Sequence, residues 1–497
     1  MEENGGRKVV DNEELFDQKR IRIEKLEKLR ELGVNPYPYR FETTHTTADI
    51  KNQEKEIIGK DGISIAGRIM AKRGHGKTVF ADLKDKTGKL QVYFRKDKLG
   101  DKPFEIVKLL DIGDFIGVTG EIFRTGTGEI TLLVKDFILL AKSLFPLPEK
   151  WHGLKDKETR YRKRYLDLMM NDDVKETFII RAKIIKRMRE ILNGKGFIEV
   201  ETPVLQPLYG GAFAKPFKTY YNVLERDYFL RISDELYLKR LIIGGIDKVY
   251  EICKDFRNEG IDKLHNPEFT MMEAYEAYAD YLDMLNLTEE LITDIVKNIN
   301  GNLRLEFQGK EIDFSRPWRK VSFYGVLKDY AGKDLSNFSQ DELFAFAKEQ
   351  GIDVEKNTSR GKLLDEIFSE KVEPNLIQPT FVIDYPIDIS PLAKRHREKT
   401  GVVERFEPFV AGMEIGNAFS ELNDPIDQRE RFIEQKKMRE SGDEEFQVLD
   451  EDFLTAMEHG MPPTGGLGIG IDRLVMILTN APSIREVILF PQLKTKE

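Results

Sequence analysis

The sequence contains a single cysteine, Cys253, among its 497 residues. One cysteine excludes an intramolecular disulfide and any zinc site that needs several thiolates. The six histidines are scattered, without the spacing of metal ligands. This composition is typical of proteins in a reducing compartment, and we expect a cytoplasmic location.

Long apolar runs are also absent. No run of about 18 apolar residues occurs, so we expect no membrane-spanning helix and no membrane partner, and the mean hydropathy is −0.44. The N-terminal stretch MEENGGRKVVDNEELF is polar and acidic and lacks the apolar core of a secretory signal. The length exceeds that of one ordinary domain, which predicts two or three domains.

The sequence has no overall excess of positive charge. Its net charge is −9, which taken alone argues against a nucleic acid partner. The charges are unevenly distributed, however, because residues 51–100 carry 13 Lys and Arg against 6 Asp and Glu. An RNA-binding module on an acidic body would give this pattern, and so would ordinary scatter.

Residues 62–140 hold five short β-rich runs divided by glycines and charged turns. Five strands in about 80 residues predict a small barrel, and the OB-fold is such a barrel that binds nucleic acid. The segment from Gly74 to Thr78 resembles a phosphate loop, but Ala71 replaces its first glycine and a strand follows, so we predict a hairpin. Residues 1–50 are expected to be a helical extension, with a helix over 13–33, and residues 51–145 the barrel domain.

The rest of the chain mixes helices and strands, so the fold class is expected to be α+β. Residues 146–174 contain prolines and a basic end, which predict a linker. Residues 175–497 are expected to form the second domain, beginning with a long amphipathic helix closed by glycine. Residues 281–400 are richer in helical patterns, show no recognisable chemistry and predict a helical insertion.

Polar residues of catalytic type stand out in the segment FRNEG(x4)HNPEFTMMEAY, residues 256–275. Two antiparallel strands joined by a loop would present Arg257, Phe269 and Glu273 to one site. A guanidinium at a strand end suits bidentate contact with a phosphate or carboxylate, and a phenyl ring offers a face for a base. A structural Arg–Glu pair beside a core phenylalanine is the alternative.

Three glutamates at seven-residue intervals, Glu407, Glu414 and Glu421, mark a second segment. Carboxylates in a β context are typical magnesium ligands. Strand alternation places Asn417, Phe419 and Glu421 on one face and Glu414 on the other, so all can face one cleft only if the strand bulges, for which Gly416 is well placed. Solvated glutamates at a sheet edge are the alternative.

The third segment is the glycine run GGLGIGIDR, residues 465–473, which leads into an apolar helix. Glycines allow close approach of a ligand to the backbone, and Arg473 at a helix start favours an anion. A dinucleotide-binding interpretation fails, because the run lacks G-x-G-x-x-G and lies too near the C-terminus.

The arrangement resembles the three signature motifs of class II aminoacyl-tRNA synthetases. The first motif matches a long helix and strand ending in Pro203 (GFIEVETP), the second the FRNEG strand–loop–strand around Arg257, and the third the GIGIDR strand and helix with Arg473. The barrel places the resemblance near the aspartate, asparagine and lysine enzymes. The words RISDELYLKRL, HNPEFTMMEAY and EIGNAFSELNDP are most similar to the lysyl-tRNA synthetase family, from about residue 13 to the C-terminus. The resemblance implies an antiparallel catalytic sheet flanked by helices.

The resemblance also implies a role for each matching residue. Lysine would be bound by Gly211, Glu235, Arg257, Glu273, Tyr275, Asn417, Phe419 and Glu421. ATP would be bound by Arg257, Glu259, His265, Asn266, Phe269 and Arg473, with Arg257 and Arg473 catalytic. Magnesium, with more than one ion per subunit, would be bound by Glu407 and Glu414, and the anticodon of tRNA(Lys) by Arg68, Phe80 and Gln91.

The first motif of class II enzymes lies at a two-fold interface, so a homodimer is also implied. One departure is Phe213 with Lys215 in the loop GGAFAKPF, where the relatives have glycine and alanine. The alternatives are an aspartyl or asparaginyl synthetase, against which the pocket glutamates argue, a protein-modifying paralogue, which would lack the barrel, and a non-catalytic RNA-binding paralogue. The last should have lost Arg257 or Arg473, and both are present.

Overall fold

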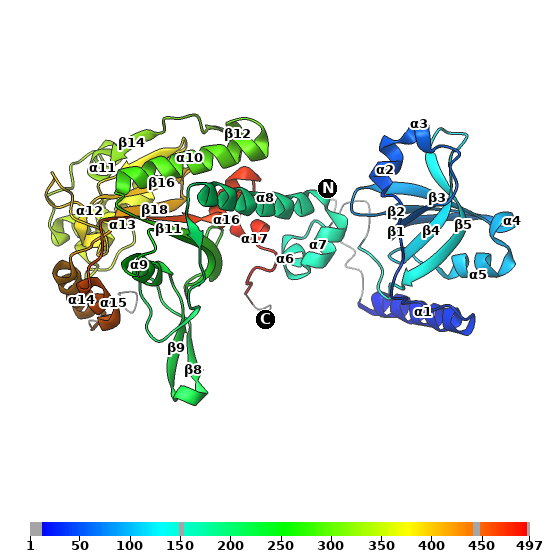
Figure 1. Cartoon of the computed structure of the whole chain (residues 1–497), viewed down its shortest axis with the longest axis horizontal. Helices are drawn as coiled ribbons and strands as arrows, with labels where there is room; N and C mark the ends of the chain where they lie inside the picture. The colour runs from blue at the N-terminus through cyan, green and yellow to red at the C-terminus, as the bar shows by residue number, and fades with distance from the viewer. Residues whose placement is uncertain (1–11, 149–153, 441–447, 495–497) are drawn as a thin grey trace, which may run out of the picture. The chain divides into compact units, whose positions relative to one another are not determined.

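A computed structural model describes residues 12–148, 154–440 and 448–494. The chain divides into two compact units, Met1–Leu154 and Lys155–Glu497, which are considered separately (Figure 1). The start of the extension expected over 1–50 lies outside the described residues. Within the described ranges, no helix has the length and apolar character needed to cross a membrane.

The N-terminal unit is a closed five-stranded barrel in the order β1-β2-β3-β5-β4, which confirms the predicted fold of this region. Alternate residues of each strand point inward and form one apolar core. The predicted hairpin is present, since His75 pairs with Thr78 across the first turn. The strands are β1 (Ile63–His75), β2 (Thr78–Lys84), β3 (Lys89–Arg95), β4 (Phe115–Arg124) and β5 (Ile130–Ala141). The helices are α1 (Asn12–Glu31), α2 (Thr47–Asn52), α3 (Glu54–Ile57), α4 (Lys96–Leu99) and α5 (Asp101–Leu109).

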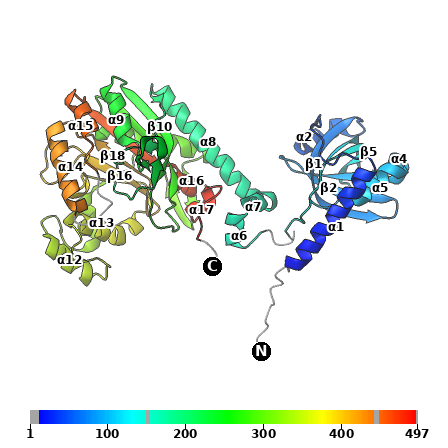
Figure 2. The same cartoon turned by 90° about the horizontal axis from the view of Figure 1, so that it is seen from below.

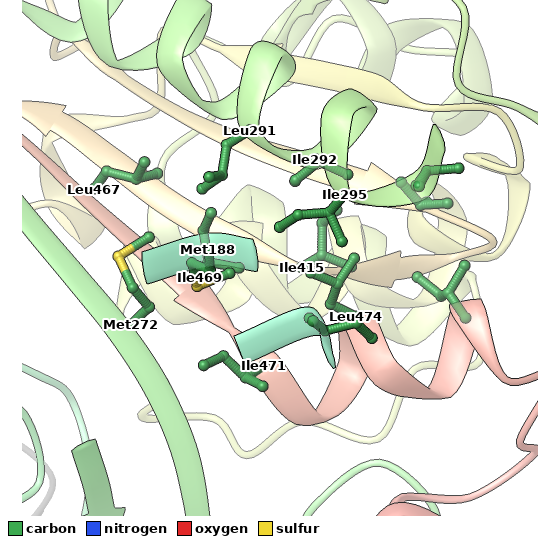
Figure 3. Packing of buried hydrophobic residues seen from close by; sticks show 14 of the residues in the cluster. Met188, Met272, Leu291, Ile292, Ile295, Ile415, Leu467, Ile469, Ile471 and Leu474 are labelled. Carbon is green, nitrogen blue, oxygen red and sulfur yellow. The ribbon is translucent and has the colours of Figure 1, made fainter. Parts of the chain in front are cut away.

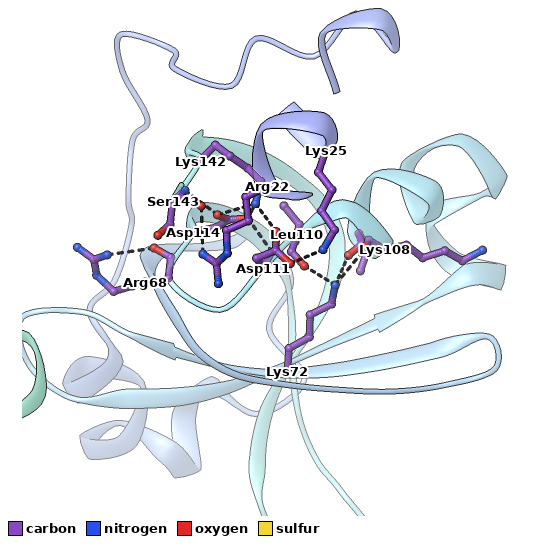
Figure 4. A network of polar contacts seen from close by, with 12 residues as sticks. Arg22, Lys25, Arg68, Lys72, Lys108, Leu110, Asp111, Asp114, Lys142 and Ser143 are labelled. Carbon is purple, nitrogen blue, oxygen red and sulfur yellow. Dashed lines mark hydrogen bonds and ion pairs between the residues drawn. The ribbon is translucent and has the colours of Figure 1, made fainter. Parts of the chain in front are cut away.

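Helix α1 is fixed to the barrel by charged groups (Figure 4), and also by Leu29, which is fully buried in the barrel core. Lys25 donates to Asp111 at 2.5 Å, and Lys142, fully buried, is 2.7 Å from Asp111 and 2.9 Å from Asp114. Arg22 donates to the carbonyl oxygens of Ser143 and Phe145, both at 3.1 Å. Buried charges that are paired in this way avoid most of their desolvation cost. The basic residues of α1 therefore hold the helix in place.

The second unit is built on a nine-stranded sheet in the order β14-β15-β16-β18-β19-β11-β10-β6, with β17 paired to β16. Its centre is antiparallel, as expected, and its two outer pairs, β14–β15 and β10–β6, are parallel. The sheet strands are β6 (Ile198–Glu199), β10 (Lys248–Phe256), β11 (Glu268–Ala277), β14 (Arg319–Ser322), β15 (Thr380–Ile383), β16 (Arg405–Val410), β17 (Met413–Glu414), β18 (Gly416–Ser420) and β19 (Thr464–Gly470). A small separate sheet comprises β7 (Leu205–Gln206), β8 (Lys218–Tyr221) and β9 (Arg226–Leu230).

One face of the main sheet is covered by three helices, α8 (Asp172–Gly194), α10 (Tyr281–Asn300) and α16 (Ile471–Leu478). Figure 3 shows their side chains meeting those of the sheet in the largest apolar core. Met188 of α8, Ile292 of α10 and Leu474 of α16 are fully buried there. Truncating such a residue to alanine costs about 2–5 kcal/mol. This dry core holds the sheet rigid, and the opposite face is left for a site.

Several of the remaining helices lie at the two ends of the unit (Figures 1 and 2). Figures 1 and 2 place α12 (Gln340–Glu349), α13 (Arg360–Lys371), α14 (Pro425–Glu440) and α15 (Glu451–Glu458) at the end opposite α6 (Lys157–Arg162) and α7 (Arg164–Met170). The others are α9 (Glu235–Ile243), α11 (Phe323–Ala331) and α17 (Ile484–Val487).

The segment 281–400 differs from the helical insertion predicted for it. It does contain α10 to α13, but it also holds the hairpin β12 (Arg304–Phe307) and β13 (Lys310–Asp313), and β14 and β15 extend the main sheet. These strands are four residues long, and β15 reads TFVI without alternation. So short a continuous apolar run gives no period from which a strand could be assigned.

The segment 146–174, predicted to be a linker, also differs, because α6 and α7 fold onto the second unit. Arg164 is fully buried and donates to Asp167 at 2.6 Å and to the carbonyl oxygens of Leu489 and Arg485 at 3.0 and 2.7 Å. The basic character of this stretch reflects buried ion pairing as well as solvation, which composition alone does not distinguish.

Candidate active site

A cavity of about 510 Å³ lies on the face of the sheet that the three helices leave uncovered. It is bordered by β11, β16, β17, β18 and β19, by the turn that follows β10, and by the start of α9. Every residue that the sequence predicted for lysine, ATP or metal lines it: Gly211, Glu235, Arg257, Glu259, His265, Asn266, Phe269, Glu273, Tyr275, Glu407, Glu414, Asn417, Phe419, Glu421 and Arg473. Four separate stretches of sequence thus meet in one place.

Arg257 follows β10 directly, and Phe269 lies on β11 opposite Asp255. The guanidinium carbon of Arg257 is 5.0 Å from the centre of the Phe269 ring, and its Nε donates to the carbonyl oxygen of Ile232 at 3.4 Å. Among the described residues, Arg257 takes part in no ion pair. The alternative of a structural Arg257–Glu273 pair is therefore not what forms, and the guanidinium remains available for an anion.

Arg473 stands in the first turn of α16, as predicted. It donates to the carbonyl oxygen and to Oε2 of Glu414 at 2.7 and 3.0 Å, and lies 3.2 Å from Nε2 of His265. Because an arginine can only donate, Nε2 must be the acceptor. The imidazole proton then sits on Nδ1, which is 2.8 Å from Asp262. Arg473 is thus held between His265, which contacts Asp262, and Glu414, and these contacts fix its orientation.

The strand carrying Glu414 and Asn417 bulges at Gly416, as alternation predicted. Phe409 pairs with Glu414 and Phe406 with Ala418, so three residues on one side face two on the other. A Cβ at Gly416 would lie 2.6 Å from the carbonyl oxygen of Gly468, and only glycine fits. The extra residue turns Glu414 to the same side as Asn417, and both line the cavity.

Four acids gather at the end of the cavity near Arg473: Glu407, Glu414, Asp365 and Glu373. The sequence predicted the first two. Glu407 accepts from Tyr385 at 2.6 Å and from Arg405 at 2.5 Å, and burial raises its pKa to about 7. Burial raises the pKa of Glu373 to about 7, with nearby Glu414 adding to the rise, and Asp365, which is exposed, lies near them. Asp365 and Glu373 come from α13 and the turn after it, within the segment where the sequence showed no chemistry.

The other end of the cavity is lined by Glu273, Tyr275 and Glu421. Glu273 accepts from Ser233 at 3.1 Å and from Tyr275 at 2.9 Å, and burial raises its pKa to about 7. Burial also raises the pKa of Glu421, which is 1% exposed. A Cβ at Gly466 would lie 1.9 Å from Oε1 of Glu421 and 2.6 Å from the Tyr275 ring, so the glycine run makes room for both.

A buried cation, Lys239, was missed by sequence reasoning. It lies one turn after Glu235 on α9, is fully buried, and its Nζ is 2.5 Å from Oε1 of Glu235. The same ammonium forms an ion pair with Glu421. One built-in cation thus serves two of the three acids and leaves Glu273 without one. The i, i+4 spacing of Glu235 and Lys239 was a signal, but it is usually that of a solvated helix pair.

The barrel residues expected to bind the anticodon share the outer face of β1, β2 and β3. Phe80 stacks on Tyr93 with ring centres 4.1 Å apart, and Tyr93 lies 6.1 Å from Phe123. Gln91 accepts from Thr131 at 2.9 Å, and Arg68 lies over Phe115 at 4.2 Å. Tyr93 and Phe123 extend the aromatic surface beyond the residues that the sequence singled out.

Comparison with known proteins agrees with both units. Residues 156–494 match the family model of class II tRNA synthetases (D, K and N), and residues 63–140 that of the OB-fold nucleic acid binding domain. The lysine–tRNA ligase of Carboxydothermus hydrogenoformans is 52% identical over 98% of this chain and 100% of its own length. Those of Thermoanaerobacter sp. (strain X514) and Syntrophomonas wolfei are each 54% identical over 97% of this chain, and over 97% and 98% of their own lengths.

Proposed function

The chain belongs to the class II tRNA synthetases, among the lysine–tRNA ligases, and we propose that the cavity on its sheet activates lysine with ATP for transfer to tRNA(Lys). The observation that carries this proposal is the charge of the cavity end around Glu235, Glu273 and Glu421. Three buried acids share a single built-in cation there. A buried acid left without a partner favours a ligand that brings a positive charge.

The charge balance supports lysine over the related substrates. Its ε-ammonium would be held by Glu273 and Glu421, with the Tyr275 hydroxyl beside them, and its α-amino group by Glu235 and the backbone of Gly211. An aspartate side chain would meet only negative charge at this end. A neutral isostere of lysine would leave the acids unpaired, so it would be rejected without an editing step.

At the other end, the reacting groups would be held by the two arginines. Arg257, free of ion pairs among the described residues, suits the α-phosphate and the substrate carboxylate together, with Asn417 assisting. Adenine would lie between Phe269 and Arg473, and Glu259, His265 and Asn266 would contact ATP. The carboxylate oxygen of lysine attacks the α-phosphorus, the bond to the bridging oxygen breaks, and pyrophosphate leaves.

The acids at this end fit magnesium. Glu407 and Glu414 offer the hard oxygen ligands that this ion prefers, and Asp365 and Glu373 add negative charge behind them. When bound, magnesium would neutralise charge on the phosphates as pyrophosphate departs. Arg405 donates to Oε1 of Glu407 at 2.5 Å and to Oδ1 of Asn417 at 3.0 Å. These two hydrogen bonds orient both side chains toward the cavity.

Transfer to tRNA requires no protein nucleophile. A ribose hydroxyl at the 3′ end attacks the carbonyl carbon of the mixed anhydride, the ester bond forms and AMP leaves. The anticodon would meet the outer face of the barrel, where Phe80, Tyr93 and Phe123 offer rings for stacking and Arg68 and Gln91 polar groups. A cytoplasmic location follows from this role in translation.

A homodimer is supported by the surface of α8. A groove with a mainly apolar surface lies there, and Ile179 is 39% exposed. It is lined by Leu168, Phe178, Ile179, Ala182 and Leu489, with Lys175, Lys183 and Lys186 beside them. A helix that covers the sheet with one side and keeps apolar residues on another suits a two-fold contact. Light scattering at micromolar concentration should give twice the chain mass of 57.6 kDa. A mass equal to one chain would contradict the dimer.

The activity itself is tested by ATP–pyrophosphate exchange, run separately with each of the twenty amino acids. Only lysine should support rapid exchange, because only its side chain brings an ammonium to Glu273 and Glu421. Exchange with aspartate or asparagine would overturn the proposal in favour of the related synthetases. Absence of exchange with every amino acid, in protein that still binds tRNA, would identify a non-catalytic RNA-binding relative.

A further inference from the structure

Three metal-ligand side chains meet in the interior behind the Ser233–Glu273 wall of the cavity. Asp234 precedes α9, and Cys253 and Asp255 lie on the same face of β10. One carboxylate oxygen from each aspartate and the sulfur of Cys253 lie within 4.8 Å of one another. Asp234 and Asp255 are 0% exposed and Cys253 6%. Neither the lysine site nor the ATP site uses these three residues.

The oxygens of this cluster lack the partners that buried carboxylates require. Both side-chain oxygens of Asp234, and Oδ2 of Asp255, accept no hydrogen bond from an ordinary donor among the described residues, and the group within hydrogen-bond reach of Asp234 is the carboxyl of Glu273, another acid. Asp234 stands at the start of α9, where an aspartate usually accepts from the backbone of the first turn, yet its side chain makes no such bond. A dry, unpartnered carboxylate is costly, so its environment must supply a proton or a cation.

Two basic groups, Arg257 and Arg231, lie near Asp255, and Arg257 also lines the cavity. Arg231 donates to Oε1 of Glu251 at 2.7 Å and to the carbonyl oxygen of Lys254 at 2.9 Å, and its Nε is 3.5 Å from Oδ1 of Asp255. Its charge is therefore shared between Glu251 and Asp255. Cys253 is 3.7 Å from the same Oδ1, and the next group toward the cavity, Glu273, is another acid. The cluster holds more negative than positive charge.

We propose that Asp234, Cys253 and Asp255 bind a divalent metal ion of the zinc type, as a structural site behind the lysine pocket. A thiolate with two carboxylates is a donor set that zinc accepts, and three protein ligands leave one tetrahedral position for water. The thiol of Cys253 loses its proton to solvent as the metal–sulfur bond forms. The three ligand charges then meet the two charges of the ion, which removes most of the imbalance.

The test uses the full-length protein, stripped of metal with a chelator and then titrated with Co²⁺. A cobalt–thiolate bond gives an intense near-ultraviolet absorption band, and Cys253 is the only thiol in the chain. This band therefore separates the cluster from the oxygen ligands of the magnesium site. We expect the band to saturate at one Co²⁺ per chain, and one zinc per chain to survive dialysis after zinc loading.

Matched variants identify the ligands. Cys253→Ser should abolish the band, and Asp234→Asn should weaken cobalt binding at least about tenfold, since one charged ligand contact is lost. Glu407→Gln, which removes a carboxylate from the separate acid cluster, should keep the band. Circular dichroism establishes that each variant is folded. Wild-type protein without the band and without retained zinc would overturn the proposal, and the acids would then be held by protons.

Discussion

The two ends of the cavity handle buried charge in opposite ways. Around Glu235, Glu273 and Glu421 the only cation that the described part of the chain provides is Lys239, which is fully buried and fixed between two acids. Around the phosphate end, two half-buried arginines, Arg257 and Arg473, stand at the edge of the cavity, and one of them takes part in no ion pair among the described residues. At the lysine end, Lys239 balances part of the acid charge and Glu273 is left for the substrate ammonium, whereas at the phosphate end Arg257 is left for the substrate anions.

This difference separates selection from reaction. A buried, fixed group of acids strongly favours the binding of a side chain with one positive charge, which suits the selection of an amino acid. Half-exposed guanidiniums can follow phosphates as bonds form and break, which suits charge that develops in a transition state. Substitutions at the two ends should therefore affect different quantities. At the lysine end they should change the KM for lysine, and at the phosphate end they should change kcat.

The largest effect is expected from Lys239→Met. Removing one partner of a buried ion pair leaves Glu235 and Glu421 uncompensated, and such a loss costs about 3–5 kcal/mol. Urea denaturation measures it, with Trp318 in the core of this unit as the fluorescent probe once Trp151 is replaced by Phe. Lys248→Met is the matched control, because its pair with Glu276 is partly exposed and worth at most about 1 kcal/mol. Equal losses in the two variants would erase the proposed contrast.

At the phosphate end, Arg257→Gln should lower the rate of ATP–pyrophosphate exchange by about 10²–10³-fold, the cost of losing one transition-state donor. The free energy of unfolding should hardly change, because the Arg257 side chain makes one hydrogen bond, at 3.4 Å, among the described residues. Arg226→Gln, on the exposed strand β9, serves as control. A large loss of stability with unchanged kcat would return Arg257 to a structural role.

Gly466→Ala tests whether the lysine end of the cavity needs the space that this glycine leaves for Glu421. Its Cβ would lie 1.9 Å from Glu421 and displace that side chain, and overpacking of this kind costs about 1–3 kcal/mol. The KM for lysine should rise by the corresponding factor while the KM for ATP stays close to that of the wild type. Gly470→Ala on the same strand, whose Cβ would come no nearer than 3.9 Å to another atom, should show a smaller effect on lysine. Equal lysine defects would contradict the steric explanation.

The smallest effect is expected outside the cavity. Phe80→Ala should weaken aminoacylation by the value of one stacked base, about 1–3 kcal/mol, and leave ATP–pyrophosphate exchange nearly intact. Ile138→Ala, also partly exposed on the barrel, controls for a general loss of barrel stability. Equal loss in both assays would mean that Phe80 only packs against Tyr93.

Part of this site could be predicted from short-range rules, and the remaining residues were predicted from the resemblance to a family. Alternation along β11 puts Phe269, Glu273 and Tyr275 on one face, and the same rule required the bulge that the register shows at Gly416. The glycine run before Arg473 likewise indicated that other groups approach the backbone closely there. Each of these inferences needs only neighbouring residues.

What was missed depends on contacts between distant segments. Lys239 meets Glu421 across 182 positions of the chain, and nothing in the pattern ELYLK distinguishes it from a solvated pair. Asp365 and Glu373 reach the cavity only because β14 and β15 carry α13 to the edge of the sheet. Tertiary packing decides such positions, and local patterns do not report it.

The central claim is that buried acids select lysine by its charge, and Glu421→Gln tests it most directly. The measurement is the ratio of kcat/KM for lysine to that for norleucine, its neutral analogue, in ATP–pyrophosphate exchange. The substitution keeps size and shape and removes one charge-assisted contact, worth about 1.5–3 kcal/mol, so the ratio should fall at least about tenfold. A ratio unchanged from the wild type would contradict the account, because lysine would then be recognised without Glu421.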